Sequence, residues 1–301
     1  MNKEDNSEKI KILVCYYQPW EILSDDLFFP IQAAKASSNY NLNIQGDDTD
    51  DNISTKNDTY SEFTVWYWAW KNIKKYFPNM EYVGLSHYRR YFCMDKKEKR
   101  NKLIYSKKIP SMPNYKEFFI NDLKKYDIIL PKPEYYKYNL QMQYSYFHNS
   151  FDFACLRDIV LDLYPEYSDS FLEVFDNNKI SLYCMFVAKF ELFNKYFNWL
   201  FPILFEAERR INTTFYTQYQ KRVLAFLGER LLNVYVHHNN LKVKYRPIFF
   251  IKDEIYENKV SIIPLILKTI KFIIKIILPY GLVILIKNRK HIENKIFWNS
   301  I

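Results

Sequence analysis

The sequence predicts an α/β fold in which a mostly parallel central sheet is flanked by helices and followed by a helix-rich C-terminal half. Short apolar runs typical of buried strands alternate along the chain with amphipathic helical segments. Beyond residue 150 the helical segments dominate. A basic and strongly aliphatic stretch near the C-terminus predicts a separate amphipathic helix there.

The elements follow from the apolar pattern read along the chain. Residues 1–9 are polar and are expected to be disordered, and the apolar run 10–17 is the first strand. A helix is predicted over Ser61–Phe77, opened by a capping box of Thr59 and Glu62. The other expected strands are 82–86, 127–130, 182–189 and 242–246, and the other helices are 115–125, 150–163, 168–176, 191–211 and 217–238. Residues 10–255 are expected to form one domain.

Glycine usage excludes several modes of binding. The 301 residues include only 4 glycines, and no two of them lie close together. This excludes the dinucleotide G-x-G-x-x-G motif, the Walker A loop and the G-x-S-x-G elbow. A bound phosphate group would therefore be held by side chains. The 4 cysteines have neither C-x-x-C nor zinc spacing, which favours a reduced, cytoplasmic location.

The basic charge of the chain is concentrated at its C-terminus. Of the formal net charge of +9, residues 260–301 carry +6, so the rest is nearly neutral and no nucleic-acid partner is expected. Lys268, Lys271 and Lys275 share one stripe of a helix whose other face is aliphatic, which predicts contact with a membrane surface through residues 260–290. A core helix with exposed lysines is the alternative. A membrane-spanning helix is disfavoured, because about 20 uninterrupted apolar residues are needed.

An acidic loop follows Gly46. Asp47, Asp48, Asp50 and Asp51 place four carboxylates within five positions. Carboxylates this close repel one another unless a cation or hydrogen-bond donors compensate, so Asp47 and Asp48 are candidate ligands of Mg²⁺ or Mn²⁺. A solvated turn is the alternative interpretation, and a metal-independent reaction remains open.

The segment Ser86–Phe92 concentrates positive charge at the end of a predicted strand. In a continuous strand, His87 and Arg89 would share one face and Arg90 would lie on the other. Arginine binds phosphate oxygens through two hydrogen bonds, and ligands of open α/β sheets lie at the carboxyl ends of the strands. The segment therefore predicts a phosphate or diphosphate site, with a structural ion pair as the alternative.

Further polar residues are weaker candidates. Arg222 lies at the opening of the predicted helix 217–238, where an anion can bind, while Glu229 and Arg230 fit a local ion pair. Gln143, Tyr144 and His148 lie in a stretch expected to be irregular, and a contact with an acceptor molecule is one interpretation of them.

Taken together, the motifs resemble a bacterial family. They are Gly46–Ser54, Lys56–Asn57, Tyr60–Glu62, Tyr67–Asn72, Gly84–Phe92, Tyr126–Pro133 and Tyr219–Arg222. In this order, over roughly residues 10–250, they resemble the DUF4422 family of capsular and exopolysaccharide synthesis clusters. Its members are regarded as glycosyltransferases, some of them galactosyl- or galactofuranosyltransferases. Asp50 replaces a usual glycine, and Cys184 replaces a usual asparagine.

The resemblance implies a GT-A-like fold and transfer of a sugar from a nucleotide-sugar donor, expected to be UDP-linked, to a lipid-linked oligosaccharide at the inner face of the cell membrane. The alternative is a non-catalytic nucleotide- or polyanion-binding module. The residues expected to bind the donor are Asp47, Asp48, Asn52, Asn57, His87, Arg89, Arg90 and Arg222. Those expected at the acceptor are Gln143, Tyr144, His148 and Gln220, and the candidate catalytic bases are Glu62, Asp152 and Glu229.

Overall fold

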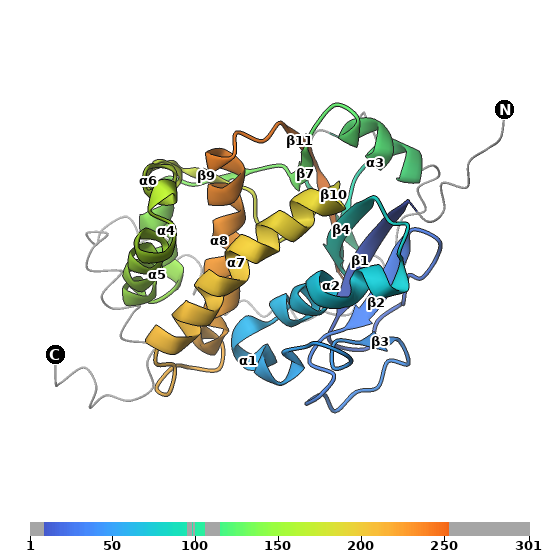
Figure 1. Ribbon diagram of the computed structural model, residues 1–301, viewed down its shortest axis with the longest axis horizontal. Helices are drawn as coiled ribbons and strands as arrows, with labels where there is room; N and C mark the ends of the chain where they lie inside the picture. The colour runs from blue at the N-terminus through green and yellow to red at the C-terminus, as the bar shows by residue number, and fades with distance from the viewer. Residues whose placement is uncertain (1–8, 95–97, 99, 106–114, 253–301) are drawn as a thin grey trace, which may run out of the picture.

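The computed structural model describes residues 9–94, 98, 100–105 and 115–252 (Figure 1). Disorder was predicted for residues 1–9, of which 1–8 lie outside the described residues. The predicted membrane-contacting helix within 260–301 also lies outside them. Within the described part of the chain, no helix is both long and apolar enough to cross a membrane.

The main sheet is mostly parallel, as predicted. Its strands run in the order β11 (Val243–Arg246), β7 (Ile128–Pro131), β10 (Phe186–Lys189), β4 (Tyr82–His87), β1 (Ile10–Tyr16), β2 (Phe28–Gln32) and β3 (Gln45–Gly46). Among these seven strands, β10 alone runs antiparallel to its two neighbours, β4 and β7. The parallel strands β1, β2 and β4 therefore end at one edge of the sheet.

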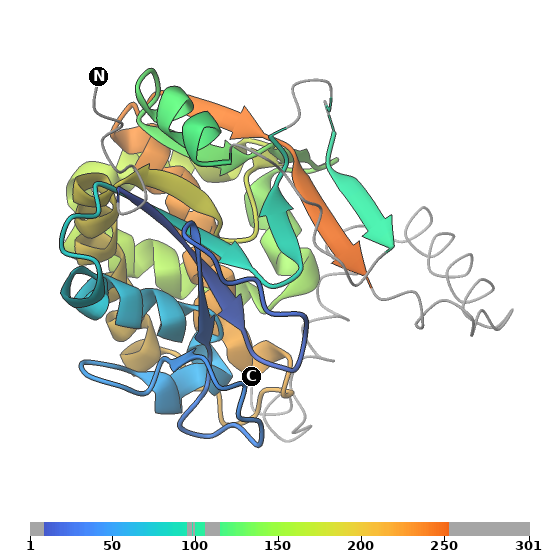
Figure 2. The same ribbon diagram turned by 90° about the vertical axis from the view of Figure 1, so that its right-hand side faces the viewer.

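Three further strands extend the sheet beyond β4. Strand β5 (Arg90–Phe92) pairs with both β4 and β12 (Ile248–Lys252), and β12 also pairs with β6 (Lys102–Tyr105). Figure 2 shows β12, in orange, running beside β6 and away from the body of the sheet. A separate small sheet joins β8 (Glu134–Tyr135) to β9 (Lys179–Ile180).

Helices cover both faces of the main sheet and form a group beside it (Figure 1). Helices α2 (Phe63–Tyr76) and α7 (Phe190–Arg210) cover one face, and α3 (Tyr115–Leu123) packs on the other. The helix-rich half, as predicted, contains α4 (Leu140–Phe147), α5 (Ser150–Leu163), α6 (Ser168–Asp176) and α8 (Val223–His238). Short helical turns lie at α1 (Asn57–Tyr60), Ser54–Lys56, Pro165–Tyr167 and Gln220–Arg222.

The first strand explains why its sequence is almost continuously apolar. Leu13 and Cys15 face the core beneath α2 and α7, whereas Ile12 and Val14 face the core beneath α3. A strand covered on both faces has no solvent-facing side, so the usual alternation of polar and apolar residues disappears. At Gly84 of β4, an added Cβ would lie 2.3 Å from Ile12 Cδ1, so any larger residue would require the Ile12 side chain to move.

The predicted start of the first long helix is wrong. Ser61 has a φ of 47° and ends the short helix α1, and α2 begins only at Phe63. The capping box is not formed: Thr59 Oγ1 donates to the carbonyl of Lys56, and Glu62 makes no side-chain cap. The left-handed turn at Ser61 leaves Glu62 available for other contacts.

Other boundaries also differ from the prediction. The segment Ser86–Phe92 is a tight hairpin, because β4 ends at His87 and β5 returns from Arg90. The stretch predicted as irregular contains α4, whose Asn139 side chain accepts a hydrogen bond from the amide of Met142. The predicted strand 182–189 is ordered as a strand only from Phe186.

Candidate functional site

A cavity of about 1000 Å³ lies at the carboxyl ends of the parallel strands. On the sheet side its wall includes Tyr17 after β1, Ala33 after β2 and His87 at the end of β4. On the helical side it includes Gln143 of α4 and Glu229 of α8. Ligands of open α/β sheets occupy this position, so the predicted phosphate segment does open into a cavity.

Two adjacent arginines supply positive charge to this cavity. Arg89 lies in the turn after β4, with its guanidinium carbon 4.8 Å from the ring centre of Tyr88 and 5.7 Å from that of Trp20. Arg90 opens β5, with its guanidinium carbon 5.0 Å from the ring centre of Tyr183. Within the described residues, neither arginine forms an ion pair with a carboxylate. Aromatic rings orient both guanidinium groups without neutralising them.

His87 differs from the two arginines in charge. Its ring is buried, and burial lowers its pKa to about 3, with a further lowering by the positive charge of Arg90. The neutral ring donates from Nε2 to the carbonyl oxygen of Tyr183 at 2.6 Å. His87, predicted to bind the donor, therefore lines the cavity as a neutral hydrogen-bond donor and adds no positive charge.

A third arginine reaches the cavity from the turn before α8. Arg222 Nε donates to Ser61 Oγ at 2.7 Å, and its Nη2 lies 3.8 Å from Glu62 Oε2. Its guanidinium carbon lies 5.6 Å from the ring centre of Phe226. The left-handed turn at Ser61 thus brings a hydroxyl group and a carboxylate to the same arginine. Arg222 lines the cavity, as predicted, on a 3₁₀ turn and not on the helix itself.

Arg230 is held more tightly than the others. It is buried, and it donates to the carbonyl of Phe226 at 2.7 Å and to Gln143 Oε1 at 3.0 Å. Its Nη1 also lies 3.6 Å from Glu229 Oε2, which agrees with the predicted local pair. The Nε of Arg230 has no hydrogen-bond partner. Gln143 was expected to contact the acceptor, but its side-chain carbonyl oxygen instead accepts a hydrogen bond that positions Arg230.

Glu229 is a carboxylate fixed inside the cavity wall. Its Oε1 accepts a hydrogen bond from the amide of Tyr183 at 2.7 Å. Burial raises the pKa of Glu229, while the nearby Arg230 and the hydrogen bond from Tyr183 lower it. A carboxyl group with a raised pKa accepts a proton more readily near neutral pH. Glu62 is the second of the predicted bases that lines the cavity.

The third predicted base does not reach the cavity. Asp152 is buried at the start of α5, and its Oδ1 accepts a hydrogen bond from Tyr216 Oη at 2.6 Å. Burial raises the pKa of its carboxyl to about 7. Asp152 is absent from the cavity wall, so the prediction that it acts as the catalytic base is not supported by its position.

Exposed aromatic side chains surround the cavity on both sides. Tyr17 is 51% exposed and Tyr40 is 52% exposed on the sheet side, while Phe147 is 45% and Tyr219 is 57% exposed on the helical side. Rings of this kind stack on bases and on the apolar faces of sugars. His148, which also lines the cavity, stacks on Phe226 at a ring distance of 4.0 Å.

The two remaining residues expected at the acceptor lie behind the cavity wall. Tyr144 is fully buried against Arg230, with 4.8 Å between its ring centre and the guanidinium carbon. Gln220 donates to the carbonyl of Phe147, and its Oε1 lies 3.2 Å from His148 Nδ1. Both residues therefore support neighbours that line the cavity and do not line it themselves.

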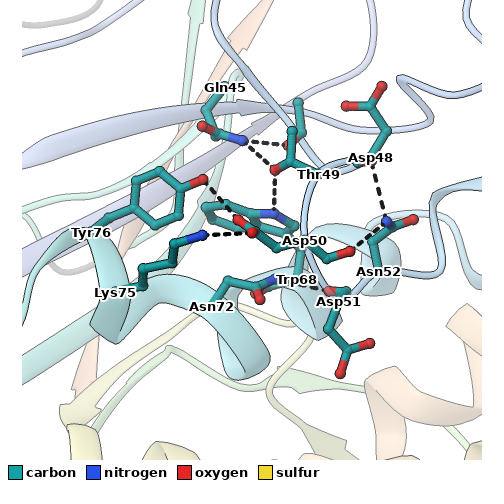
Figure 3. A network of polar contacts seen from close by, with 11 residues as sticks. Gln45, Asp48, Thr49, Asp50, Asp51, Asn52, Trp68, Asn72, Lys75 and Tyr76 are labelled. Atoms are coloured by element: carbon teal, nitrogen blue, oxygen red, sulfur yellow. Dashed lines mark hydrogen bonds and ion pairs between the residues drawn. The ribbon is translucent and has the colours of Figure 1, made fainter.

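The acidic loop is built differently from its predicted role. Figure 3 shows that Asp50 contacts Lys75 and Tyr76 and that Asn52 Nδ2 donates to the carbonyls of Asp48 and Asp50, whereas the exposed Asp48 carboxylate points away from this network. None of Asp47, Asp48 and Asn52 lines the cavity. Asn57 does line it, and its Nδ2 donates to the carbonyl of Ser61.

Asp47 shows why this loop is acidic. The residue is fully buried, and its two oxygens accept hydrogen bonds from the amides of Ala34 and Lys35 and from the hydroxyls of Ser54 and Thr64. Four protein donors leave no coordination site for a metal ion. Across the described residues, no three His, Cys, Asp or Glu side chains gather closely enough to hold a metal ion together. The assignment of Asp47 to donor or metal binding is therefore corrected to a structural role.

Sequence reasoning missed several residues of the wall. Tyr183, Ser61 and the aromatic residues Tyr17 and Tyr40 were not predicted, and Arg230 was interpreted only as a partner of Glu229. Only Tyr17, which directly follows the apolar strand β1, carried a signal, because residues at the carboxyl end of a parallel strand are candidates for ligand contact. Ser61 and Tyr183 depend on left-handed turns that lack glycine.

Fold and cavity define the chain as an α/β domain with an arginine-lined cavity at the carboxyl ends of its parallel strands. The chain belongs to the DUF4422 family, described as a domain of unknown function, whose model matches residues 11–240. No curated protein matches the chain.

A solved structure gives a second comparison. The chain is similar to a structure described as the WbbM bifunctional glycosyltransferase in its apo state, with 30% identity and a TM-score of 0.73. The match covers 81% of this chain and 46% of that one, so this chain spans about half the length of the protein it matches. The predicted α/β fold class is confirmed by this likeness.

Proposed function

We propose that this chain is a glycosyltransferase that takes a sugar from a nucleoside diphosphate sugar. The observation that carries the proposal is the pair Arg89 and Arg90, which face the cavity without a carboxylate partner among the described residues. Charged side chains left unpaired in a cavity call for an anionic ligand. A diphosphate supplies oxygens for both guanidinium groups.

The chemistry of transfer matches the charges of the wall. When the bond between the anomeric carbon and the diphosphate breaks, negative charge develops on the leaving diphosphate, and fixed cations stabilise it. A new bond forms between the acceptor oxygen and the anomeric carbon, and the acceptor hydroxyl releases its proton. Glu229 and Glu62 are the two predicted bases in the wall to which that proton can pass.

The finer parts of the proposal rest on other features. The aromatic residues at the mouth suit a nucleobase and sugars, and the resemblance to DUF4422 favours UDP with galactose or galactofuranose. The basic aliphatic sequence of residues 260–290 favours contact with the inner face of the cell membrane, where a lipid-linked acceptor would lie. In this proposal arginines replace a metal ion as the charge that stabilises the leaving group.

A nucleotide screen tests the proposal. UDP, GDP, CDP and ADP, each with a corresponding nucleotide sugar, are measured for thermal stabilisation and for release of free nucleotide, with Mn²⁺ or with EDTA. We expect one nucleotide to be preferred, slow donor hydrolysis, and activity that survives EDTA. Arg157→Ala is the matched control for the Arg90→Ala variant. Arg157 is an exposed arginine paired with Asp158 outside the cavity.

Each alternative has its own result in the same screen. Equal stabilisation by heparin and by every nucleotide, without hydrolysis, would favour the non-catalytic polyanion-binding module. Complete dependence on Mn²⁺ would assign the stabilisation of the leaving group to a metal ion.

A separate experiment tests membrane contact. Removal of residues 260–301 should release the protein to the soluble fraction, and unchanged sedimentation with membranes would contradict membrane contact through this segment.

A further inference from the structure

Tyr183 lies where three walls of the cavity meet, and nothing in the sequence marks it. It contacts His87 at the end of β4, Arg90 at the start of β5 and Glu229 on α8. We propose that Tyr183 is a positioning residue that holds Arg90 for the diphosphate while fixing His87 and Glu229 beside it. This inference rests on the glycosyltransferase function proposed above.

The backbone of Tyr183 is strained in a way that serves these contacts. Tyr183 has a φ of 78° and Cys184 a φ of 50°, both in the left-handed region that residues other than glycine rarely adopt. In this conformation the carbonyl oxygen of Tyr183 accepts a hydrogen bond from His87 while its amide donates to Glu229. Strained conformations persist where the surroundings over-determine them, and they cluster at functional sites.

Both sides of the strained segment are anchored. The amide of Ser181 donates to Asn233 Oδ1 at 2.9 Å, Asn233 Nδ2 donates back to the carbonyl of Ser181 at 3.0 Å, and the Ser181 hydroxyl donates to the carbonyl of Pro131. After Cys184, strand β10 begins at Phe186 between β4 and β7. The chain therefore enters and leaves the turn at fixed points, and Tyr183 is held between them.

The ring of Tyr183 orients the guanidinium group of Arg90 without neutralising its positive charge. It lies 5.0 Å from the guanidinium carbon of Arg90 and packs edge-on against Phe250 at 5.2 Å. Its hydroxyl donates to Glu134, which also accepts a hydrogen bond from Tyr136. An aromatic face attracts and orients a guanidinium group without occupying its N–H donors. The two terminal NH₂ groups of Arg90 are thus left for the ligand, while its buried Nε has no hydrogen-bond partner. A carboxylate in place of the ring would neutralise the charge.

The test is a double-mutant cycle between Tyr183 and Arg90. The measured quantity is the Kd of the nucleoside diphosphate that is preferred in the screen of UDP, GDP, CDP and ADP, together with the midpoint of thermal unfolding. We expect Tyr183→Leu to raise the Kd about tenfold, the size of a partly buried cation–π contact. In the Arg90→Ala background, the same change should raise the Kd less than twofold, because the contact is already lost.

Two further variants separate positioning from folding. Tyr183→Phe keeps the ring and loses only the bond to Glu134, so its Kd should stay within about twofold of the unsubstituted protein. Phe250→Leu removes packing from the same ring outside the cavity wall, and it should lower the unfolding midpoint without raising the Kd tenfold. Because Arg89 remains in every variant, binding can still be measured at millimolar nucleotide.

Several outcomes would overturn the inference. They are an unchanged Kd in Tyr183→Leu, equal losses with and without Arg90, or a Tyr183→Phe variant as weak as Tyr183→Leu. If Arg90→Ala itself left the Kd unchanged, the diphosphate assignment of the proposed function would fail. If Arg90→Ala weakened binding and Tyr183→Leu did not, only the role of Tyr183 would fail.

Discussion

The acidic loop after β3 and the basic hairpin between β4 and β5 are two charged motifs of the first half, and the protein uses them in opposite ways. The carboxylate of Asp47 accepts four hydrogen bonds from protein donors, and Asp50 is paired with Lys75. Arg89 and Arg90 have aromatic neighbours but no carboxylate partner within the described residues. The number of charged residues in a segment therefore does not identify the candidate ligand site. Charged side chains without an oppositely charged partner, such as Arg89 and Arg90, do identify it.

The largest effect should come from substituting Asp47, because its carboxylate accepts four hydrogen bonds from the protein. In Asp47→Ala, two amides and two hydroxyls lose their acceptor, and we expect the free energy of unfolding to fall by about 5 kcal/mol. Urea denaturation measures this loss. Asp47→Asn, which keeps one acceptor oxygen, should lose roughly half as much. If either variant stayed fully stable and lost nucleotide binding instead, the acidic loop would belong to the ligand site.

Asp152 extends the comparison to a buried carboxylate with a single donor. Its pKa is raised to about 7 by burial, whereas the unfolded carboxyl titrates near about 3.9, so the folded protein holds an extra proton between these values. The free energy of unfolding should therefore fall as the pH rises from about 4 to about 7, by up to about 4 kcal/mol.

The matched variant for this effect is Asp152→Asn, whose amide oxygen still accepts the hydrogen bond from Tyr216. Urea midpoints measured between pH 5 and pH 8 should fall less steeply in the variant. Glu229, whose pKa is also raised by burial, contributes to the slope in both proteins. Identical slopes in the two proteins would show that Asp152 is ionised in the folded state throughout this range.

Substituting Arg90, which has no carboxylate partner among the described residues, should affect ligand binding and leave the stability of the fold nearly unchanged. We expect Arg90→Ala to lower kcat/KM for donor hydrolysis about 100-fold, because a fixed cation stabilises the leaving diphosphate. Its unfolding midpoint should match that of Arg157→Ala, the control outside the cavity. A variant that lost stability and kept its activity would make Arg90 a structural residue.

The smallest effect is expected at the exposed end of the acidic loop. Lys75 Nζ lies 2.6 Å from Asp50 Oδ1, but the pair is solvated, and exposed ion pairs add little to stability. Lys75→Ala should leave both the unfolding midpoint and the nucleotide Kd unchanged within the error of the measurement. A clear fall in nucleotide affinity would connect this loop to the cavity after all.

Much of the fold was predictable because local sequence determines it. The apolar run at β1, the alternation of strands and helices and the helix-rich second half each follow from hydrophobic pattern. The prediction failed where tertiary contacts override that pattern. Ser61 interrupts a helical stretch with a left-handed turn, and β2, a strand that contains Pro30, was not predicted.

The candidate site was predictable to the extent that it is encoded in one segment. The tandem Arg89 and Arg90 were visible because two arginines end an apolar strand. The hairpin that turns them was not, since it contains neither glycine nor proline at its turn. Contacts between Tyr183 and Glu229, 46 residues apart, or between Arg222 and Ser61, 161 residues apart, exist only in the folded chain.

A scarcity of glycine has a consequence for the entropy of binding. Backbone amides in a glycine-rich loop are ordered before a phosphate arrives, whereas arginine side chains have many rotamers to lose on binding. Trp20 beside Arg89, Tyr183 beside Arg90 and Ser61 beside Arg222 restrict those rotamers in advance. Affinity in this protein should therefore depend on the neighbours that order the arginines as well as on the number of arginines present.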